Sequence, residues 1–257
     1  MRRMILFRFH ERFDICRDRI ALIRKLNPGI EIHGLYGGRE GSEKELSNLI
    51  PVYAPSLSNQ FQGGRMNFMW KHNDLGIRAW FALFGRDLEF DMLHVLEWDL
   101  LVLEPVEKAF TAVGEGQVGL TGLKPLANAP HDWRWMTHEP SASEWKGLLA
   151  FAKAELGYNQ LPHACQGPGM CFPKAFLERY ADAGPKVLQL CHEELRLPLY
   201  AQVLGFQLMD TGITRDWVTS FFNCRKNPIP RKAIELELAE PNGCRVFHPF
   251  FERFELP

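Results

Sequence analysis

Two acidic residues follow an apolar segment in the middle of the chain. Residues 92–97 are Met-Leu-His-Val-Leu-Glu, and Trp98 and Asp99 come next. Carboxylates beside such an apolar stretch are costly unless they bind a metal, pair with a cation or reach solvent. If the strand continues, Glu97 and Asp99 point the same way and form a pair of hard oxygen donors suited to Mg²⁺ or Mn²⁺. The same spacing also fits one acid that caps a turn and one that pairs with an arginine.

Three other polar positions could take part in chemistry. Glu194, with its neighbour Glu193, precedes a helix predicted to begin at Pro198, where acidic residues are common helix caps. His248 precedes a proline in the last part of the chain, where an imidazole is commonly a loop residue bonded to backbone. Asp74 falls on an apolar helical stripe, so it either faces a cleft or is neutralised by an arginine such as Arg8 or Arg78.

The elements that must position these residues follow an α/β order. Apolar periodicity predicts a strand at Met4–Phe9, a helix at 13–26 and a second strand at 30–36. This β-α-β order favours parallel pairing with a right-handed crossover. Further helices are predicted at 43–49, 67–84, 104–113, 141–156, 173–181, 185–191 and 198–204, and further strands at 51–54, 117–122, 163–172 and 206–209, besides the central one that begins at Met92. Loops are expected at 56–64 and at 124–140, the second with Trp133 and Trp135 as a possible pocket wall or satellite cluster.

Composition excludes several classes of protein. The 257 residues are 46% hydrophobic and 24% charged with a formal net charge of -1, which gives no broad attraction to nucleic acid or anionic membranes. The six cysteines contain no CxxC pair, so reduced thiols in the cytoplasm are expected. No signal peptide and no membrane-spanning segment are predicted.

Common catalytic motifs are also absent from the sequence. There is no GxGxxG after the first strand, no GxxxxGK[ST] and no GxSxG, which disfavours dinucleotide folds, P-loop NTPases and serine hydrolases. Residues 192–196 are His-Glu-Glu-Leu-Arg, which is not the HExxH of a zinc protease.

The order of several segments resembles that of GT-A glycosyltransferases, in particular an uncharacterised bacterial group of putative glycosyltransferases. The segments that carry the resemblance are Pro28-Gly29, IHGLYGG at 32–38, WKHNDLGIRAW at 70–80, HVLEWD at 94–99, GPG at 167–169, ELRLPLYAQVLG at 194–205 and FHP at 247–249. The resemblance implies a single domain over 1–257, a three-layer α/β/α fold with a mostly parallel central sheet. Residues 1–103 would form the nucleotide-binding half and residues 104–257 the acceptor-binding half.

The resemblance also implies roles for individual residues. In this family an acidic motif at a strand end holds Mn²⁺ or Mg²⁺ against the donor diphosphate, a role that falls to Glu97 and Asp99 here, although the first position is Glu rather than Asp. His248 resembles the late histidine ligand. Glu194 and its neighbour Glu193 occupy the place of the base, with Glu194 the preferred candidate, and Arg196 would either orient this acid or contact phosphate. Since ligands bind at the carboxyl ends of strands in open α/β sheets, the residues expected at the nucleotide are Phe9, His10, Tyr36, Gly37, Lys71, Asp74 and Trp98.

The expected function is therefore a metal-dependent, hexosyltransferase-like transfer from a nucleotide-sugar to a hydroxyl acceptor, in surface-polysaccharide or glycoconjugate synthesis. The Trp133 and Trp135 loop is expected to stack on an acceptor sugar. A sugar-nucleotide nucleotidyltransferase is disfavoured, because residues 8–12 after the first strand contain no glycine. A non-catalytic nucleotide- or carbohydrate-binding domain stays open as an alternative.

Overall fold

The fold is described from a computed structural model that covers residues 1–55, 69–183, 191–214, 221–222 and 227–256. The helices are α1 (Phe13–Leu26), α3 (Asn73–Leu83), α4 (Val106–Ala109), α5 (Arg134–Thr137), α6 (Ser141–Glu155), α7 (Lys174–Asp182), α8 (Glu193–Val203) and α9 (Arg231–Ala239), with 3₁₀ turns η1 (Ser42–Leu46), η2 (Gly85–Asp87) and η3 (Leu126–Asn128). The strands are β1 (Arg3–Phe9), β2 (Glu31–Tyr36), β3 (Val52–Tyr53), β4 (Met92–Glu97), β5 (Leu101–Val102), β6 (Val118–Pro125), β7 (His163–Pro173), β8 (Leu208–Asp210) and β9 (Val246–Phe247).

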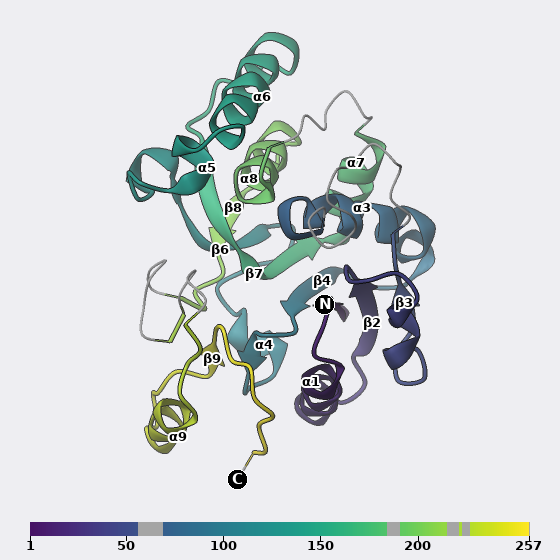
Figure 1. Cartoon of the computed structure of the whole chain (residues 1–257). Coiled ribbons are helices and arrows are strands. Elements are labelled where there is room, and N and C mark those ends of the chain that lie inside the picture. Colours follow the sequence, from purple (N-terminus) through teal and green to yellow (C-terminus); the bar gives the residue numbers. More distant parts are fainter. Residues whose placement is uncertain (56–68, 184–190, 215–220, 223–226, 257) are drawn as a thin grey trace.

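A seven-stranded sheet in the order β3-β2-β1-β4-β7-β6-β8 forms the centre of the molecule (Figure 1). The first four strands are parallel to one another, β7 is antiparallel to both β4 and β6, and β8 is parallel to β6. The sheet is therefore mostly parallel, as predicted. Its two central strands, β1 and β4, run side by side, so their carboxyl ends lie together.

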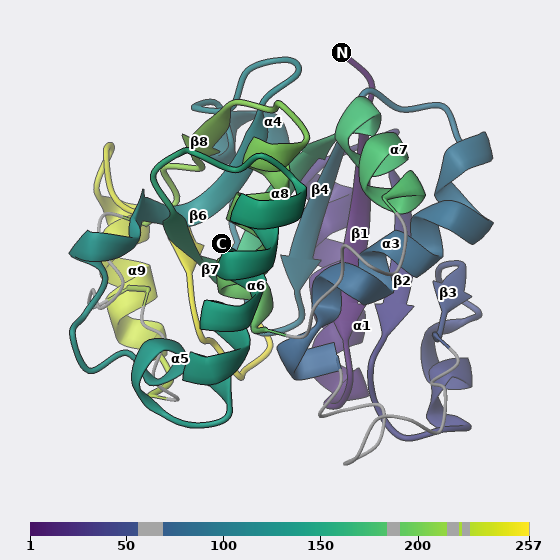
Figure 2. The same ribbon diagram turned by 90° about the horizontal axis from the view of Figure 1, so that it is seen from above.

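Helices cover both faces of this sheet, which gives the predicted three layers (Figures 1 and 2). Side chains alternate across β1, so Met4 and Leu6 pack beneath α3, while Ile5 and Phe7 pack against α1 on the opposite face. Because both faces are buried, β1 and β4 are almost continuously apolar. A polar side chain at the end of either strand is therefore an exception that calls for a partner.

A small second sheet brings the end of the chain back to the middle. β5 pairs antiparallel with β9, with Leu101 opposite Phe247. Apolar side chains of these strands and of α9 form a separate cluster that includes Leu103, Ile234 and Phe250. Beside this cluster, the buried Arg19 of α1 donates hydrogen bonds to the carbonyls of Phe250 and Glu252. These contacts hold the C-terminal segment against α1 and the end of β4.

The structure corrects several predicted elements. The central strand ends at Glu97 in a turn through Trp98 and Asp99, because the chain leaves this sheet to pair with β9. The helix predicted at 104–113 is the single turn α4. Pro198 lies inside α8 rather than at its start. Proline has no N–H to bond the carbonyl of Glu194, and the thiol of Cys165 donates to that carbonyl instead, at 3.5 Å.

Some expectations concern residues outside the described part of the chain. The predicted loop at 56–64, the first residues of the helix at 67–84 and most of the helix at 185–191 fall in this group. In the described residues, α3 begins only at Asn73. Within the part of the chain that the structure describes, no helix has the length and apolar character needed to cross a bilayer.

Candidate active site

Arg8 and Glu97 face each other at the carboxyl ends of β1 and β4. They are register partners in the parallel pairing of these strands, and their side chains form an ion pair. Both side chains are largely buried, with 15% and 14% of their surface exposed. The spacing of acids in the sequence did not indicate that Arg8 is the partner of Glu97, because the two residues lie on strands that are far apart in the chain.

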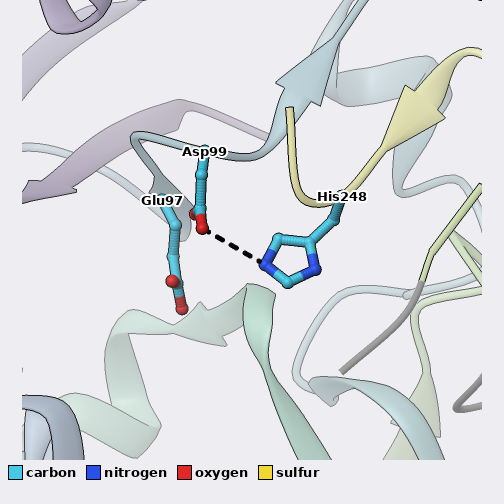
Figure 3. A group of neighbouring side chains, drawn as sticks. All are labelled: Glu97, Asp99 and His248. Atoms are coloured by element: carbon cyan, nitrogen blue, oxygen red, sulfur yellow. Dashed lines mark ion pairs between the residues drawn. The ribbon is translucent and has the colours of Figure 1, made fainter. Parts of the chain in front are cut away.

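The turn after β4 redirects the chain and brings Asp99 towards the C-terminal segment. The amide of Leu100 donates to the carbonyl of Glu97 across this turn at 3.1 Å. The amide of Phe250 donates to the carbonyl of Asp99 at 2.9 Å, and the amide of His248 donates to the carbonyl of Phe221 at 3.0 Å. These backbone bonds place the imidazole Nε2 of His248 3.6 Å from Oδ2 of Asp99 (Figure 3).

Glu97, Asp99 and His248 form a cluster that can hold a metal ion. One donor atom from each of the three lies within 4.8 Å of the others (Figure 3). Oδ1 of Asp99 is buried and has no hydrogen-bond partner among the described residues. An unsatisfied buried carboxylate oxygen beside an imidazole fits a divalent cation that accepts both oxygen and nitrogen ligands. The expected convergence of these side chains is therefore observed, while metal binding itself stays a prediction.

The charges of this cluster perturb one another. Burial raises the pKa of Glu97, and the negative charge of Asp99 adds to the rise, although Arg8 opposes it. For Asp99, burial also favours the protonated form, but the positive charges of His248 and Arg8 outweigh it and lower the pKa. The pKa of Asp99 is thus lowered and that of Glu97 raised, because His248 and Arg8 outweigh burial at Asp99 while burial dominates at Glu97.

Glu193 links this cluster to the helix layer. Its Oε1 accepts from Arg8 at 3.3 Å, and its Oε2 accepts from the backbone amide of Asp74 at the start of α3, at 2.9 Å. The side chain is only 2% exposed, and burial raises its pKa to about 8. Glu193 therefore contacts Arg8 and α3 rather than an open site.

Glu194 lies beside this network at the start of α8. Its Oε2 accepts from the indole Nε1 of Trp135 at 2.6 Å, and its Oε1 accepts from the amide of Gly167 at 3.1 Å. The helix cap is His192, whose Nδ1 accepts from the amide of Glu194 at 3.3 Å. Burial raises the pKa of Glu194 to about 7 against the opposing effect of both hydrogen bonds. A carboxylate with this pKa is suited to accept a proton near neutral pH.

Gly167 of β7 lies where the side chains of Glu97, Glu193 and Glu194 approach one another. A Cβ at this position of β7 would lie 3.3 Å from Oε1 of Glu193 and 3.5 Å from Oε1 of Glu97, while the Gly167 amide donates to Glu194. The absence of a side chain here lets three carboxylates from β4 and α8 approach one point of β7. The sequence showed Gly167 only as part of a GPG segment; its contacts required the fold.

Asp74 and Arg196 have a different environment from the one predicted. They form an ion pair with each other, and both side chains are fully buried. Tyr180 also donates to Asp74, and Arg196 donates to the carbonyl of Cys191 at 2.6 Å. Asp74 is thus neutralised by Arg196 rather than by Arg8 or Arg78, and neither side chain faces an open site. Contact of Asp74 with a nucleotide, and contact of Arg196 with Glu194 or a phosphate, are not supported by this arrangement.

Most residues expected at the nucleotide are covered by protein. Phe9 and Tyr36 are buried against each other, with ring centroids 5.1 Å apart, so Tyr36 offers no free face to a base. A Cβ on Gly37 would lie 2.8 Å from the Cβ of Met69, so this glycine admits Met69. Lys71 forms an ion pair with Glu144 of α6 at 2.6 Å. These four residues therefore have structural contacts in place of the expected ligand contacts.

His10 and Trp98 are in contact with each other but differ in exposure. The side chain of His10 is 37% exposed, and its ring meets Trp98 edge to face at 5.6 Å. Trp98 itself is buried and stacks on Phe251 at 5.4 Å. His10 is therefore a partly exposed ring next to Trp98, and its Nε2 lies 3.5 Å from Oε1 of Glu11.

The aromatic loop is partly built into the core. Trp135 is buried and stacks on His192 with ring centroids 3.7 Å apart, so it cannot also stack on a sugar. The exposed ring is Trp70, which is 53% exposed and meets Trp135 edge to face at 5.3 Å. Arg134 lies over both indoles, 5.3 Å from the centroid of Trp70 and 4.6 Å from that of Trp135. Trp70 lies within the helix predicted at 67–84, but its side chain is exposed.

Among known proteins, solved structures are similar to this chain. No protein-family model matches the sequence, and no curated protein matches it. An active-site mutant of LgtC has a TM-score of 0.41 and 13% identity, over 79% of this chain and 71% of that one. The galactosyltransferase LgtC in complex with donor and acceptor sugar analogs has the same TM-score and 12% identity, over 79% and 72%. The apo bifunctional glycosyltransferase WbbM has a TM-score of 0.48 and 12% identity, over 95% of this chain and 45% of that one.

Proposed function

We propose that this protein is a metal-dependent glycosyltransferase that moves a sugar from a nucleotide-sugar donor to a hydroxyl acceptor. The observation that carries the proposal is the cluster of Glu97, Asp99 and His248 beside a second group of acids headed by Glu194. The first group has the donor atoms of a divalent-cation site, and the second has a carboxylate whose pKa is raised to about 7. A metal-dependent inverting transfer from a nucleotide-sugar uses both functions, the cation at the leaving group and the base at the acceptor.

Asp99, His248 and a carboxylate oxygen of Glu97 are the proposed ligands of the cation. When bound, a divalent cation stabilises the charge that develops on the diphosphate leaving group. An imidazole in the ligand set favours Mn²⁺ over Mg²⁺. His10, exposed beside Trp98, is the proposed contact for the nucleotide.

Glu194 is the proposed base of an inverting transfer, the case in which the acceptor hydroxyl loses its proton to a protein group. Its two hydrogen bonds, from Trp135 and Gly167, fix the carboxylate in place. Burial keeps its pKa close to neutral, although a position in the first turn of α8 favours the ionised form. Glu193 and Arg196 are proposed to act indirectly, Glu193 through Arg8 and Arg196 through the buried pair with Asp74.

A role in surface-polysaccharide or glycoconjugate synthesis and transfer of a hexose are part of the proposal and rest on the sequence resemblance. A cytoplasmic location is also part of the proposal and rests on the cysteine pattern. A binding domain without catalysis is the second candidate, and the Arg8–Glu97 ion pair favours it, because that pair neutralises one of the acids without any metal. The two candidates differ in whether the donor is cleaved.

The test is a thermal-shift screen of nucleoside diphosphates with and without Mn²⁺, followed by donor hydrolysis with the best nucleotide. Stabilisation by a ligand follows mass action, so a shift that requires both Mn²⁺ and one diphosphate identifies the donor class. We expect Asp99→Asn to remove the metal-dependent shift and the hydrolysis. Asp91→Asn, just before β4 at its opposite end, is the matched control and should retain both. Binding without hydrolysis would favour the second candidate, and no shift with any diphosphate would refute the proposed function.

A further inference from the structure

Arg8 is a buried cation in direct contact with a carboxylate of the candidate metal cluster. It pairs with Glu97, and its second contact is Glu193 at 3.3 Å. The guanidinium and the metal cluster therefore share Glu97, which lies between Arg8 and the pair formed by Asp99 and His248.

The shared carboxylate creates a competition between two cations. The ion pair with Arg8 neutralises part of the negative charge that Glu97 could offer to a metal ion. The positive charge of Arg8 also repels a divalent ion nearby. Both effects weaken binding of a cation, and both are strong because the side chains are largely buried, where charges are poorly screened. Asp99 and His248 alone would hold a divalent ion with only two protein ligands.

We propose that Arg8 competes with the divalent cation for Glu97 and so keeps the affinity of the unliganded protein for metal low. The inference rests on the proposed function and adds a residue that acts against metal binding. Arg8 also forms an ion pair with Oε1 of Glu193, and Oε2 of Glu193 accepts a hydrogen bond from the amide of Asp74 at 2.9 Å. Arg8 can therefore leave Glu97 without leaving the site, and its charge then becomes available to an anionic diphosphate.

Binding of Mn²⁺ alone, followed by electron paramagnetic resonance, tests the inference without any turnover. We expect Arg8→Gln to bind Mn²⁺ about tenfold more tightly than the unmodified protein, since one positive charge beside the ion is removed. Arg8→Lys, which retains the charge, should bind Mn²⁺ much less tightly than Arg8→Gln. Arg2→Gln removes an equal charge just before β1, at its opposite end, and should leave the affinity unchanged.

Two further variants separate this inference from the proposed function. If Asp99→Asn does not weaken Mn²⁺ binding, the metal site of the proposed function is refuted. If Asp99→Asn weakens binding but Arg8→Gln does not strengthen it, the competition alone is refuted. In the Glu97→Gln background, the gain from Arg8→Gln should shrink, because the shared carboxylate is gone. Thermal melting of each variant shows whether it is folded, and Arg8→Lys provides the comparison if Arg8→Gln melts early.

Discussion

The indole Nε1–H of Trp135 donates a hydrogen bond of 2.6 Å to Oε2 of Glu194. Trp135 is buried in the main core and stacks on His192, which caps the helix that begins at Glu193. The indole therefore holds the carboxylate from one side, while the amide of Gly167 holds it from the other. A side chain expected to stack on a sugar instead positions the proposed base.

Replacement of Trp135 by Phe is expected to move the pH profile of kcat/KM upward. The hydrogen bond from Trp135 lowers the pKa of Glu194, so its loss lets burial raise that pKa further. A hydrogen bond to a charged group contributes roughly 1.5 kcal/mol, and about 1.4 kcal/mol corresponds to one pKa unit, so we expect a shift of about one unit. Trp145→Phe, in the same core on α6, is the control and should leave the profile in place. An unshifted profile in Trp135→Phe would contradict the positioning role.

Glu194→Gln is expected to lower kcat by roughly 10²- to 10⁴-fold, the usual contribution of a general base. In the unmodified protein, kcat/KM should rise with pH through about 7, because the base acts only when it is deprotonated and burial raises its pKa to about 7. The rising limb should be absent in Glu194→Gln. Glu155→Gln, at the exposed end of α6, serves as the control. Activity within a few-fold of the unmodified protein would rule Glu194 out as the base.

His248→Asn is expected to weaken Mn²⁺ binding more than Mg²⁺ binding. The imidazole nitrogen is the ligand that favours Mn²⁺, and Asn replaces it with an oxygen or amide group. The measurement is the ratio of the two metal affinities, taken from competition titrations. His131→Asn, at an exposed position outside the cluster, should leave the ratio unchanged. A ratio that is equal in both variants would show that His248 is not a ligand.

Asp74→Asn is expected to lower the free energy of unfolding by about 3–5 kcal/mol, because it leaves Arg196 as an unpaired buried charge. Urea denaturation measures the loss, and Asp182→Asn, in an exposed ion pair with Arg86, should lose less than about 1 kcal/mol.

The same pair predicts how stability depends on acid. Interactions with Arg196 and Tyr180 outweigh burial and hold the pKa of Asp74 below its usual value. The contribution of ionised Asp74 to stability is therefore complete above the pKa that Asp74 has in the unfolded chain. This contribution is lost as the pH falls towards the lower pKa that Asp74 has in the folded protein. The Asp74→Asn variant should lack this part of the acid dependence. Equal acid dependence in both proteins would contradict the assignment.

Trp70→Ala is expected to weaken binding of an acceptor sugar while donor hydrolysis with Mn²⁺ continues. Trp70 is the exposed ring next to Trp135, and an exposed indole offers an apolar face to a sugar ring. The effect should appear in the acceptor KM. Replacement of Leu83 by Ala is the control, because Leu83 is also exposed and lies on α3. If the acceptor KM is the same in Trp70→Ala, the acceptor lies elsewhere.

Local pattern was enough for much of the fold. The apolar segments at β1 and β4 and the amphipathic α1 could be predicted because burial on one or two faces requires those periodicities. The short elements were harder. The pairing of β5 with β9 and the position of Pro198 inside α8 depend on distant contacts, so sequence alone misplaced the end of the central strand and the start of that helix.

The sequence by itself determined which residue types stand at strand and helix ends, and it therefore indicated Glu97, Asp99, His248 and Glu194. Only the tertiary structure decided which partners the acidic residues have. Glu97 pairs with Arg8, Glu194 accepts from Trp135 and Gly167, and Asp74 pairs with Arg196. The physical reason is that a buried charge or polar group must be satisfied by whatever side chain the fold brings within reach. These partners lie between 27 and 122 positions away in the chain, a separation at which local sequence pattern carries no information.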